Sequence, residues 1–280
     1  MELNDSGSAE AGPFSFCVLT AFLSFIMDEA MIIVFFHFIS LQDMALVRFS
    51  KHHQQDLLTD SKSNGDTMSK KSNNEIRAAG KYTTSISGEG FMSYELRIAA
   101  KLLAEGLNRE AAVKRIVSEN LFQYPTEKSL QKKANAAMRL LAALPDESLI
   151  LAIAEEPSET SKQICLYAMM RHYRLVRDFM VSVIGEKYRL KETFFSRADV
   201  NIFFMRLQEQ NDVAARWSDS TVEKMEQVLM KTLAETGYVD KIESKRLNSV
   251  LISPILEKAI RADGDVAVLP AFDCFSQCSE

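Results

Sequence analysis

Cysteine is scarce in this sequence, and the few that occur form no pattern. The 280 residues contain four, Cys17, Cys165, Cys274 and Cys278. Such scatter excludes a disulfide framework and suits a reducing, cytoplasmic compartment. The closest pair, Cys274 and Cys278, has no histidine nearby, and zinc normally takes four ligands. We therefore expect a cytoplasmic protein that holds neither a metal nor another cofactor.

The sequence also lacks the short motifs of common enzymes. It has no glycine-rich phosphate loop, no GxSxG elbow, no HExxH helix and no CxxC pair. His172 stands among aromatic residues and arginines, with no acid or nucleophile spaced to serve it. Catalysis needs a set of groups that this pattern does not display. We therefore predict that the chain is not an enzyme and has no catalytic residue.

A net positive charge is missing as well. The formal net charge is −5, and so the chain as a whole does not suggest a nucleic-acid partner. The acids are concentrated at the start. Residues 1–67 contain three cations and nine acids, whereas residues 68–280 contain 30 cations and 29 acids. In the second part, local clusters rather than the total decide which charged partners bind.

No hydrophobic run reaches the roughly 20 residues of a transmembrane helix. Residues 13–49 hold two apolar stretches that Asp28 and Glu29 separate, and joining them would place two acids at mid-membrane. A polar, linker-like stretch follows, and Met68 opens a second candidate start. We interpret residues 1–67 as an over-extended gene start. A membrane anchor through residues 13–49 and an unusual packing segment are the alternatives.

From Phe91 onward, apolar residues recur at helical spacing. We predict helices over residues 93–105, 109–122 and 127–144, with Gly106 ending the first. Asn108 and Thr126 are the expected N-caps of the second and third. The short connections and the turn at Pro125 between the last two helices are typical of a helix-turn-helix unit.

The helix over residues 127–144 has two contrasting faces at 100° per residue. Leu130, Ala134, Ala137, Leu141 and Leu144 form the expected core stripe. The opposite line holds Lys128, Lys132, Asn135 and Arg139, with Gln131 and Lys133 beside it. Lysine and arginine suit phosphates, and amides suit base edges. Exposed helix faces are commonly polar, however, and so an ordinary solvated surface remains the competing interpretation.

A second unit with the same order begins near Ser196. We expect a helix over residues 196–210, a short helix ending at a core Trp217, and a third helix that a Ser220/Glu223 capping box begins and Gly237 ends. A small hairpin or wing is expected around residues 241–252. Four cations are candidate DNA contacts here: Lys224, Lys231, Lys245 and Arg246.

The sequence therefore predicts an all-α protein with two helical lobes. The N-terminal extension covers residues 1–67, and the first helix-turn-helix lobe covers residues 68–145. Connecting helices span residues 146–190, where Met169, Met170 and Met180 are expected to fill the core. The second lobe and its tail cover residues 191–280.

Several of these stretches resemble the BrxA family of bacteriophage-exclusion (BREX) defence systems. The likeness covers residues 78–262 and rests on loose motifs: Y-x-x-S-x-S-G-E-x-F at Tyr82–Phe91, E-G-L at Glu105–Leu107, E-N-L-F-Q at Glu119–Gln123, the basic helix ending in M-R-L-L-A-A-L, W-S-D-S-T at Trp217–Thr221 and L-I-S-P at Leu251–Pro254. The resemblance implies a small all-helical accessory protein that binds double-stranded DNA and has no known enzymatic role of its own.

Three hypotheses follow from the residues and the resemblance together. The first is a DNA-binding component of a phage-defence complex that contacts double-stranded DNA and other defence proteins. The second is an adaptor whose lobes dock other proteins of the complex without a direct DNA role. The third is a membrane-tethered factor that uses residues 13–49. The first accounts best for the basic helix.

Overall fold

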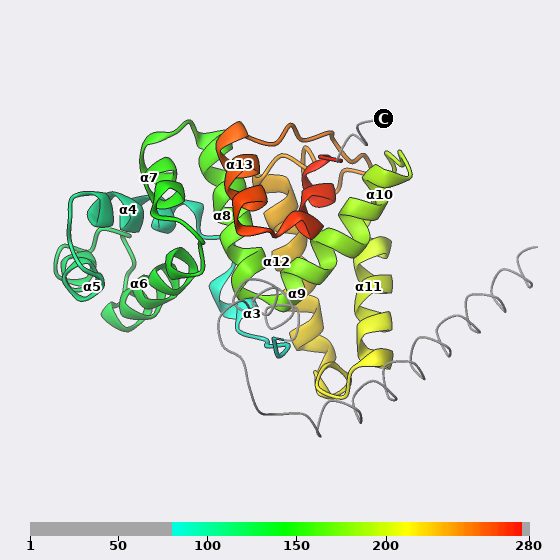
Figure 1. Cartoon of the computed structure of the whole chain (residues 1–280). Coiled ribbons are helices and arrows are strands. Elements are labelled where there is room, and N and C mark those ends of the chain that lie inside the picture. The colour runs from blue at the N-terminus through cyan, green and yellow to red at the C-terminus, as the bar shows by residue number, and fades with distance from the viewer. Residues whose placement is uncertain (1–79, 276–280) are drawn as a thin grey trace, which may run out of the picture. The chain divides into compact units, whose positions relative to one another are not determined.

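The computed structural model describes residues 80–275, and every regular element in that range is a helix (Figure 1). The all-α prediction is confirmed. The elements are α3 (Ile86–Glu89), α4 (Ser93–Ala104), α5 (Arg109–Ser118), α6 (Glu127–Ala142), α7 (Glu147–Glu155), α8 (Ser158–His172), α9 (Arg174–Phe179), the π-helix η2 (Met180–Gly185), α10 (Glu186–Arg189), α11 (Arg197–Gln210), the 3₁₀ turn η3 (Ala214–Arg216), α12 (Asp219–Glu235), α13 (Pro254–Asp263) and η4 (Val266–Phe272).

The predicted caps of the first three long helices are confirmed. The Asn108 Oδ1 accepts from the Ala111 N–H at 2.9 Å, and the Thr126 Oγ1 accepts from the Ser129 N–H at 3.3 Å. Gly106 follows α4 with a φ of 87°, a left-handed conformation that favours glycine. These local signals fix where α4 ends and where α5 and α6 begin.

Three details of the predicted second unit are wrong. The helix α12 begins after Ser218, whose extended backbone makes it the N-cap, and so the expected Ser220/Glu223 box lies inside the helix. A capping box does occur one helix earlier, between Ser196 and Asp199. Trp217 is only partly buried and meets Tyr82 edge-on, with ring centroids 6.4 Å apart.

The expected wing is the third detail. Among the described residues there is no strand, and the segment after α12 makes a single antiparallel bridge, between Phe194 and Arg246. The Leu247 N–H donates to the Thr193 carbonyl at 2.7 Å, and the Phe195 N–H donates to the Lys245 carbonyl at 3.2 Å. The segment therefore pairs with the α10–α11 connection instead of folding back on itself.

The long helical pattern that the sequence shows over residues 162–185, within the predicted connecting helices, is interrupted at Tyr173. That residue is extended, with φ −108° and ψ 108°, and separates α8 from α9. The chain then continues through η2, where Gly185 lies against η4. A Cβ at Gly185 would sit 3.2 Å from the Pro270 Cβ. Only glycine permits this approach without a shift of η4.

Helix α8 packs against helices on both sides of the break. It contacts the earlier helices α4, α6 and α7 and the later helix α13 (Figure 1). Separately, α3 contacts α12. The predicted core methionines Met169, Met170 and Met180 are all buried. The inward face of α11 is likewise buried at Val200 and Phe204, as its periodicity predicts.

Four of the five residues in the core stripe predicted for α6 are buried, and the fifth, Leu144, lies beyond the end of the helix and is partly buried. Leu130, Ala134, Ala137 and Leu141 are 3%, 0%, 0% and 1% exposed. Ala136, Met138 and Leu140 are buried as well, because α6 packs against α4, α5 and α8. The open face is therefore narrower along the second half of α6 than along the first.

Replacing Leu141 with alanine should lower the free energy of unfolding by about 2–5 kcal/mol, because a buried leucine leaves a cavity. Urea unfolding followed by circular dichroism measures the change. Lys101→Ala on the exposed side of α4 is the control and should shift stability by no more than about 0.5 kcal/mol. A loss below about 1 kcal/mol for Leu141→Ala would mean that this face of α6 is not packed as described.

Candidate nucleic-acid interface

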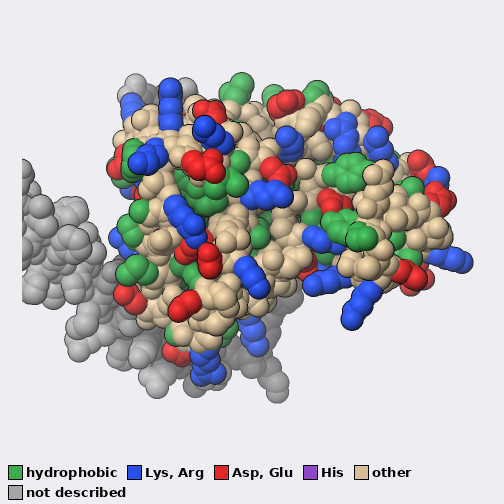
Figure 2. All heavy atoms as spheres, turned by 180° about the vertical axis from the view of Figure 1, so that it is seen from behind, with side chains coloured by type: hydrophobic (Ala, Val, Ile, Leu, Met, Phe, Trp, Pro, Cys, Tyr) green, Lys and Arg blue, Asp and Glu red, His purple; other side chains and the backbone are tan. Residues whose placement is uncertain are grey.

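The open face of α6 begins directly after its N-cap. Lys128, Gln131 and Lys132 are exposed, whereas Lys133, Asn135 and Arg139 are partly buried. The first two turns of the helix therefore offer two lysines and an amide to solvent. Figure 2 shows Lys and Arg side chains projecting from the part of the surface that carries α4–α6.

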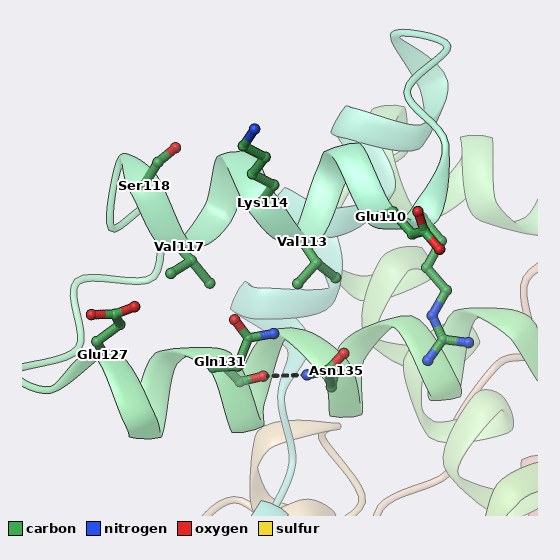
Figure 3. A pocket seen from close by; sticks show the side chains of 9 residues that line it. Glu110, Val113, Lys114, Val117, Ser118, Glu127, Gln131 and Asn135 are labelled. Atoms are coloured by element: carbon green, nitrogen blue, oxygen red, sulfur yellow. Dashed lines mark hydrogen bonds between the residues drawn. The ribbon is translucent and has the colours of Figure 1, made fainter.

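A groove between α5 and α6 borders this face on one side (Figure 3). Its volume is about 490 Å³. Val113 and Val117 of α5 face Gln131 and Asn135 of α6 across it. The Asn135 Nδ2 donates to the Gln131 carbonyl at 3.0 Å. Its amide is thus already used within the helix, and Gln131 is the freer of the two.

The charges around the groove are mixed. Arg109 and Lys114 contribute positive charge, and Glu110 and Glu127 contribute negative charge. The sequence analysis did not select Arg109 and Lys114 as candidate contacts. The three cations of α5, Arg109, Lys114 and Arg115, could have indicated a basic helix. The groove therefore extends the basic face only at these two side chains.

Helix α3 borders the basic face on the other side. The Lys133 Nζ donates to the Glu89 carbonyl, and a Cβ at Gly88 would lie 3.3 Å from the Lys132 Nζ. Burial lowers the pKa of Lys133; the carboxylates of Glu95 and Glu89 oppose this shift, and the cations of Lys132 and Lys231 add to it. Lys231 of α12 therefore belongs to the same electrostatic neighbourhood as the lysines of α6.

Arg139 points to a buried partner. Its Nη2 lies 2.8 Å from the Glu89 Oε1, and the Glu89 side chain is 6% exposed. The other carboxylate oxygen accepts from the Tyr173 hydroxyl. Burial, then this hydrogen bond, raises the pKa of Tyr173. Periodicity placed Arg139 on the outward line of α6, but the structure pairs it with Glu89, a residue whose role sequence reasoning missed.

The remaining four candidate cations lie on two segments of the chain, α12 and the segment that follows it. Lys224 and Lys231 are seven residues apart on α12 and share a face, and the Lys231 Nζ lies 3.5 Å from the Glu235 Oε1. Lys245 and Arg246 lie on the segment that pairs with residues 193–195. The described structure thus brings Lys132, Lys133 and Lys231 together and carries Lys245 and Arg246 on a different segment.

Residues 80–275 contain no group of three or more His, Cys, Asp or Glu side chains placed to hold a metal ion. No helix among them is both long enough and apolar enough to cross a bilayer. Residues 1–67, which we interpret as an over-extended gene start with a membrane anchor at residues 13–49 as an alternative, lie outside the described residues, as does Cys278.

Replacing Glu89 with glutamine should destabilise the fold by about 1–3 kcal/mol, because the buried hydrogen bonds from Arg139 and Tyr173 lose their charged acceptor. Thermal or urea unfolding measures this loss. Glu105→Gln removes the exposed ion pair with Arg115, in which the Glu105 side chain is 54% exposed, and should cost no more than about 1 kcal/mol. Equal effects of the two substitutions would show that Glu89 is not a buried anchor.

Comparisons with known proteins identify related chains. A family model described as BrxA matches residues 80–264. The BREX protein BrxA of Bacillus cereus (strain H3081.97) is 34% identical over 185 residues, which are 66% of this chain and 92% of the relative. The BREX protein BrxA of Escherichia coli O9:H4 (strain HS) is 29% identical, with 63% and 83% covered. An uncharacterized protein from Magnetospirillum magneticum has a similar fold, with a TM-score of 0.60, 22% identity and 69% and 98% coverage.

Proposed function

The chain belongs to the BrxA family of BREX phage-defence proteins, and from that premise we propose that it is the non-enzymatic, DNA-binding component of such a system. The proposed contact surface is the basic face of α6. Lys128 and Lys132 meet phosphates, and Gln131 reaches toward base edges. Lys231 of α12 adds a phosphate contact at the edge of this surface.

The observation that supports the proposal is the exposure of Lys128 and Lys132 on a helix whose opposite face is buried. The buried stripe fixes which face of α6 is open, so that both lysines project from defined positions on that face. The cations of Lys132 and Lys231 lower the pKa of Lys133, so the three ammonium groups repel one another, and a bound phosphate relieves that repulsion. Glu127 in the first turn is the acid nearest to this pattern along α6.

The binding mode that suits these residues is dominated by phosphates. Each phosphate that a lysine neutralises releases counterions, and so affinity falls steeply with salt. A single exposed amide supplies little base discrimination. We therefore propose weak sequence preference, with α4–α6 acting as the helix-turn-helix unit and α6 as the helix that approaches the duplex. We propose that the protein acts in the cytoplasm, where its DNA target lies.

Lys128→Glu with Lys132→Glu should abolish the electrophoretic mobility shift of duplex DNA at physiological salt while leaving the circular dichroism spectrum and melting temperature unchanged. Both side chains are exposed, so that neither is needed for packing. Arg139 is left intact, because a glutamate there would face the buried carboxylate of Glu89 and unfold the protein for a reason unrelated to DNA.

The matched control is Lys101→Glu with Lys258→Glu, exposed lysines of α4 and α13, which changes the net charge equally. It should retain binding. Neutralising Lys132 alone should lower the slope of log affinity against log salt by about one unit. A double reversal on α6 that still shifts DNA like the control would overturn the proposed interface.

An adaptor role is the second candidate, and one observation favours it. The outer face of α11 exposes Ile202 and Met205, which are 46% and 60% exposed, and the nearby connection exposes Leu190 and Phe194, each 58% exposed. Leu190 and Ile202 line the same hollow, and neighbouring exposed apolar side chains suit a protein partner. The other proteins of the defence system are the partners proposed for this face.

Ile202→Glu with Met205→Glu should remove co-purification of the other proteins of the defence system, because charge is costly in an apolar interface. DNA binding should stay normal. Leu251→Glu with Val266→Glu, two apolar residues exposed elsewhere at 90% and 51%, is the control. Unchanged co-purification by the α11 variant would exclude this face as the docking surface.

A further inference from the structure

The break between α8 and α9 creates a second concentration of positive charge, away from the groove of α5 and α6. A cavity of about 220 Å³ opens there, and five of its seven lining residues are basic: Lys81, Arg171, His172, Arg174 and Arg177, with Gly80 and Met170. A single water needs only about 10–15 Å³ of such volume. The cavity is therefore large enough for a polyatomic ion.

The arginines are held in place by partners that do not line the cavity. The Arg177 Nη1 and Nη2 donate to Asp265 at 2.9 and 2.5 Å. The Arg174 Nε donates to Asp178 at 3.2 Å, and the Arg171 Nη1 donates to Asp263. These three carboxylates face four formal cations when Lys81 is counted. These side chains together therefore keep one positive charge in excess.

Arg171 carries an unmet hydrogen-bond donor. Its side chain is 1% exposed, its Nε donates to the Ala143 carbonyl, and its Nη2 is buried with no partner in the described structure. A buried guanidinium nitrogen without an acceptor is costly. Arg171 lines the cavity, and an acceptor oxygen there that reaches this nitrogen would remove that cost.

The Gly80–Tyr82 segment is fixed over the same cavity. The Arg174 Nη1 donates to the Gly80 carbonyl at 3.1 Å, and the Arg174 guanidinium lies 4.4 Å from the centre of the Tyr82 ring. His172 stands at the opposite end of the break. Burial, together with the cation of Arg139, lowers the pKa of His172 against the opposing charge of Glu89.

We propose that this cavity is a binding site for a phosphate group. Its lining brings together Lys81 of the N-terminal segment, Arg171 and His172 at the end of α8, and Arg174 at the start of α9, all of which carry N–H donors. Donors from several directions suit a tetrahedral phosphate, whose oxygens also point in several directions, better than a planar carboxylate. The phosphate comes from a free nucleotide or from the DNA backbone. The site is independent of the basic face of α6.

Isothermal titration of the full chain with inorganic phosphate tests the site, with sodium chloride at equal ionic strength as the reference. Saturable binding is expected. Lys81→Glu with Arg174→Gln should weaken it by roughly tenfold or more, since two charge-assisted contacts are lost. The matched control is Lys101→Glu with Arg206→Gln, exposed residues of α4 and α11, which should bind phosphate normally.

Two outcomes overturn the proposal: no saturable binding by the wild-type chain at millimolar phosphate, or equal binding by the cavity variant and its control. Because Arg174 also contacts Asp178 and Tyr82, the wild-type chain provides a test that needs no variant. The nuclear magnetic resonance signals of the His172 ring should move as phosphate is added. Ring signals that stay fixed at saturating phosphate would also overturn the site.

The same titrations identify the source of the phosphate. They also test whether the site depends on the proposed DNA interface of α6. Displacement by duplex DNA assigns the site to the backbone, whereas tighter binding of a nucleoside monophosphate than of inorganic phosphate assigns it to a free nucleotide. The Lys128→Glu/Lys132→Glu variant should keep phosphate binding. The phosphate-site proposal therefore survives if the α6 interface is disproved. It is overturned if the cavity variant binds phosphate as well as its control does.

Discussion

A buried carboxylate is stable only when its oxygens accept strong hydrogen bonds, and Glu89 meets that condition with partners from two distant parts of the chain. Arg139 reaches it from α6, and Tyr173 reaches it from the break between α8 and α9. The backbone carbonyl of the same residue accepts from Lys133. This one residue therefore anchors α3 over the middle of α6, holds the break in position, and leaves Lys128 and Lys132 as the free cations of the basic face.

Much of this architecture can be predicted from the sequence. The α6 core stripe, the caps at Asn108 and Thr126, and the glycine after α4 follow from local patterns, because each depends on residues within a turn or two of one another. The family resemblance also rests on short local motifs. Its Y-x-x-S-x-S-G-E-x-F stretch contains Glu89, but the motif alone gives no sign that the carboxylate is buried.

The features that sequence reasoning missed all depend on contacts between distant residues. Helical periodicity places Arg139 on the open side of α6, and only the position of α3 reveals that its partner is Glu89, 50 residues away. The break at Tyr173 interrupts a stretch whose local pattern is continuous. The segment after α12 was expected to form a wing, yet its backbone groups pair with residues 193–195. Whether the candidate cations bind DNA is a question of partners, which no local pattern answers.

The π-helix η2 has a consequence for how the chain tolerates changes in length. A π-helical turn contains one residue more than an α-helical turn, so removing one residue from Met180–Gly185 leaves a segment that can close as an ordinary α-helix. Removing one residue from the middle of α6 would instead rotate the lysines before it by about 100° relative to the core stripe after it. Natural variation in length is therefore better accommodated at η2, with Gly185 kept against η4, than anywhere within α6.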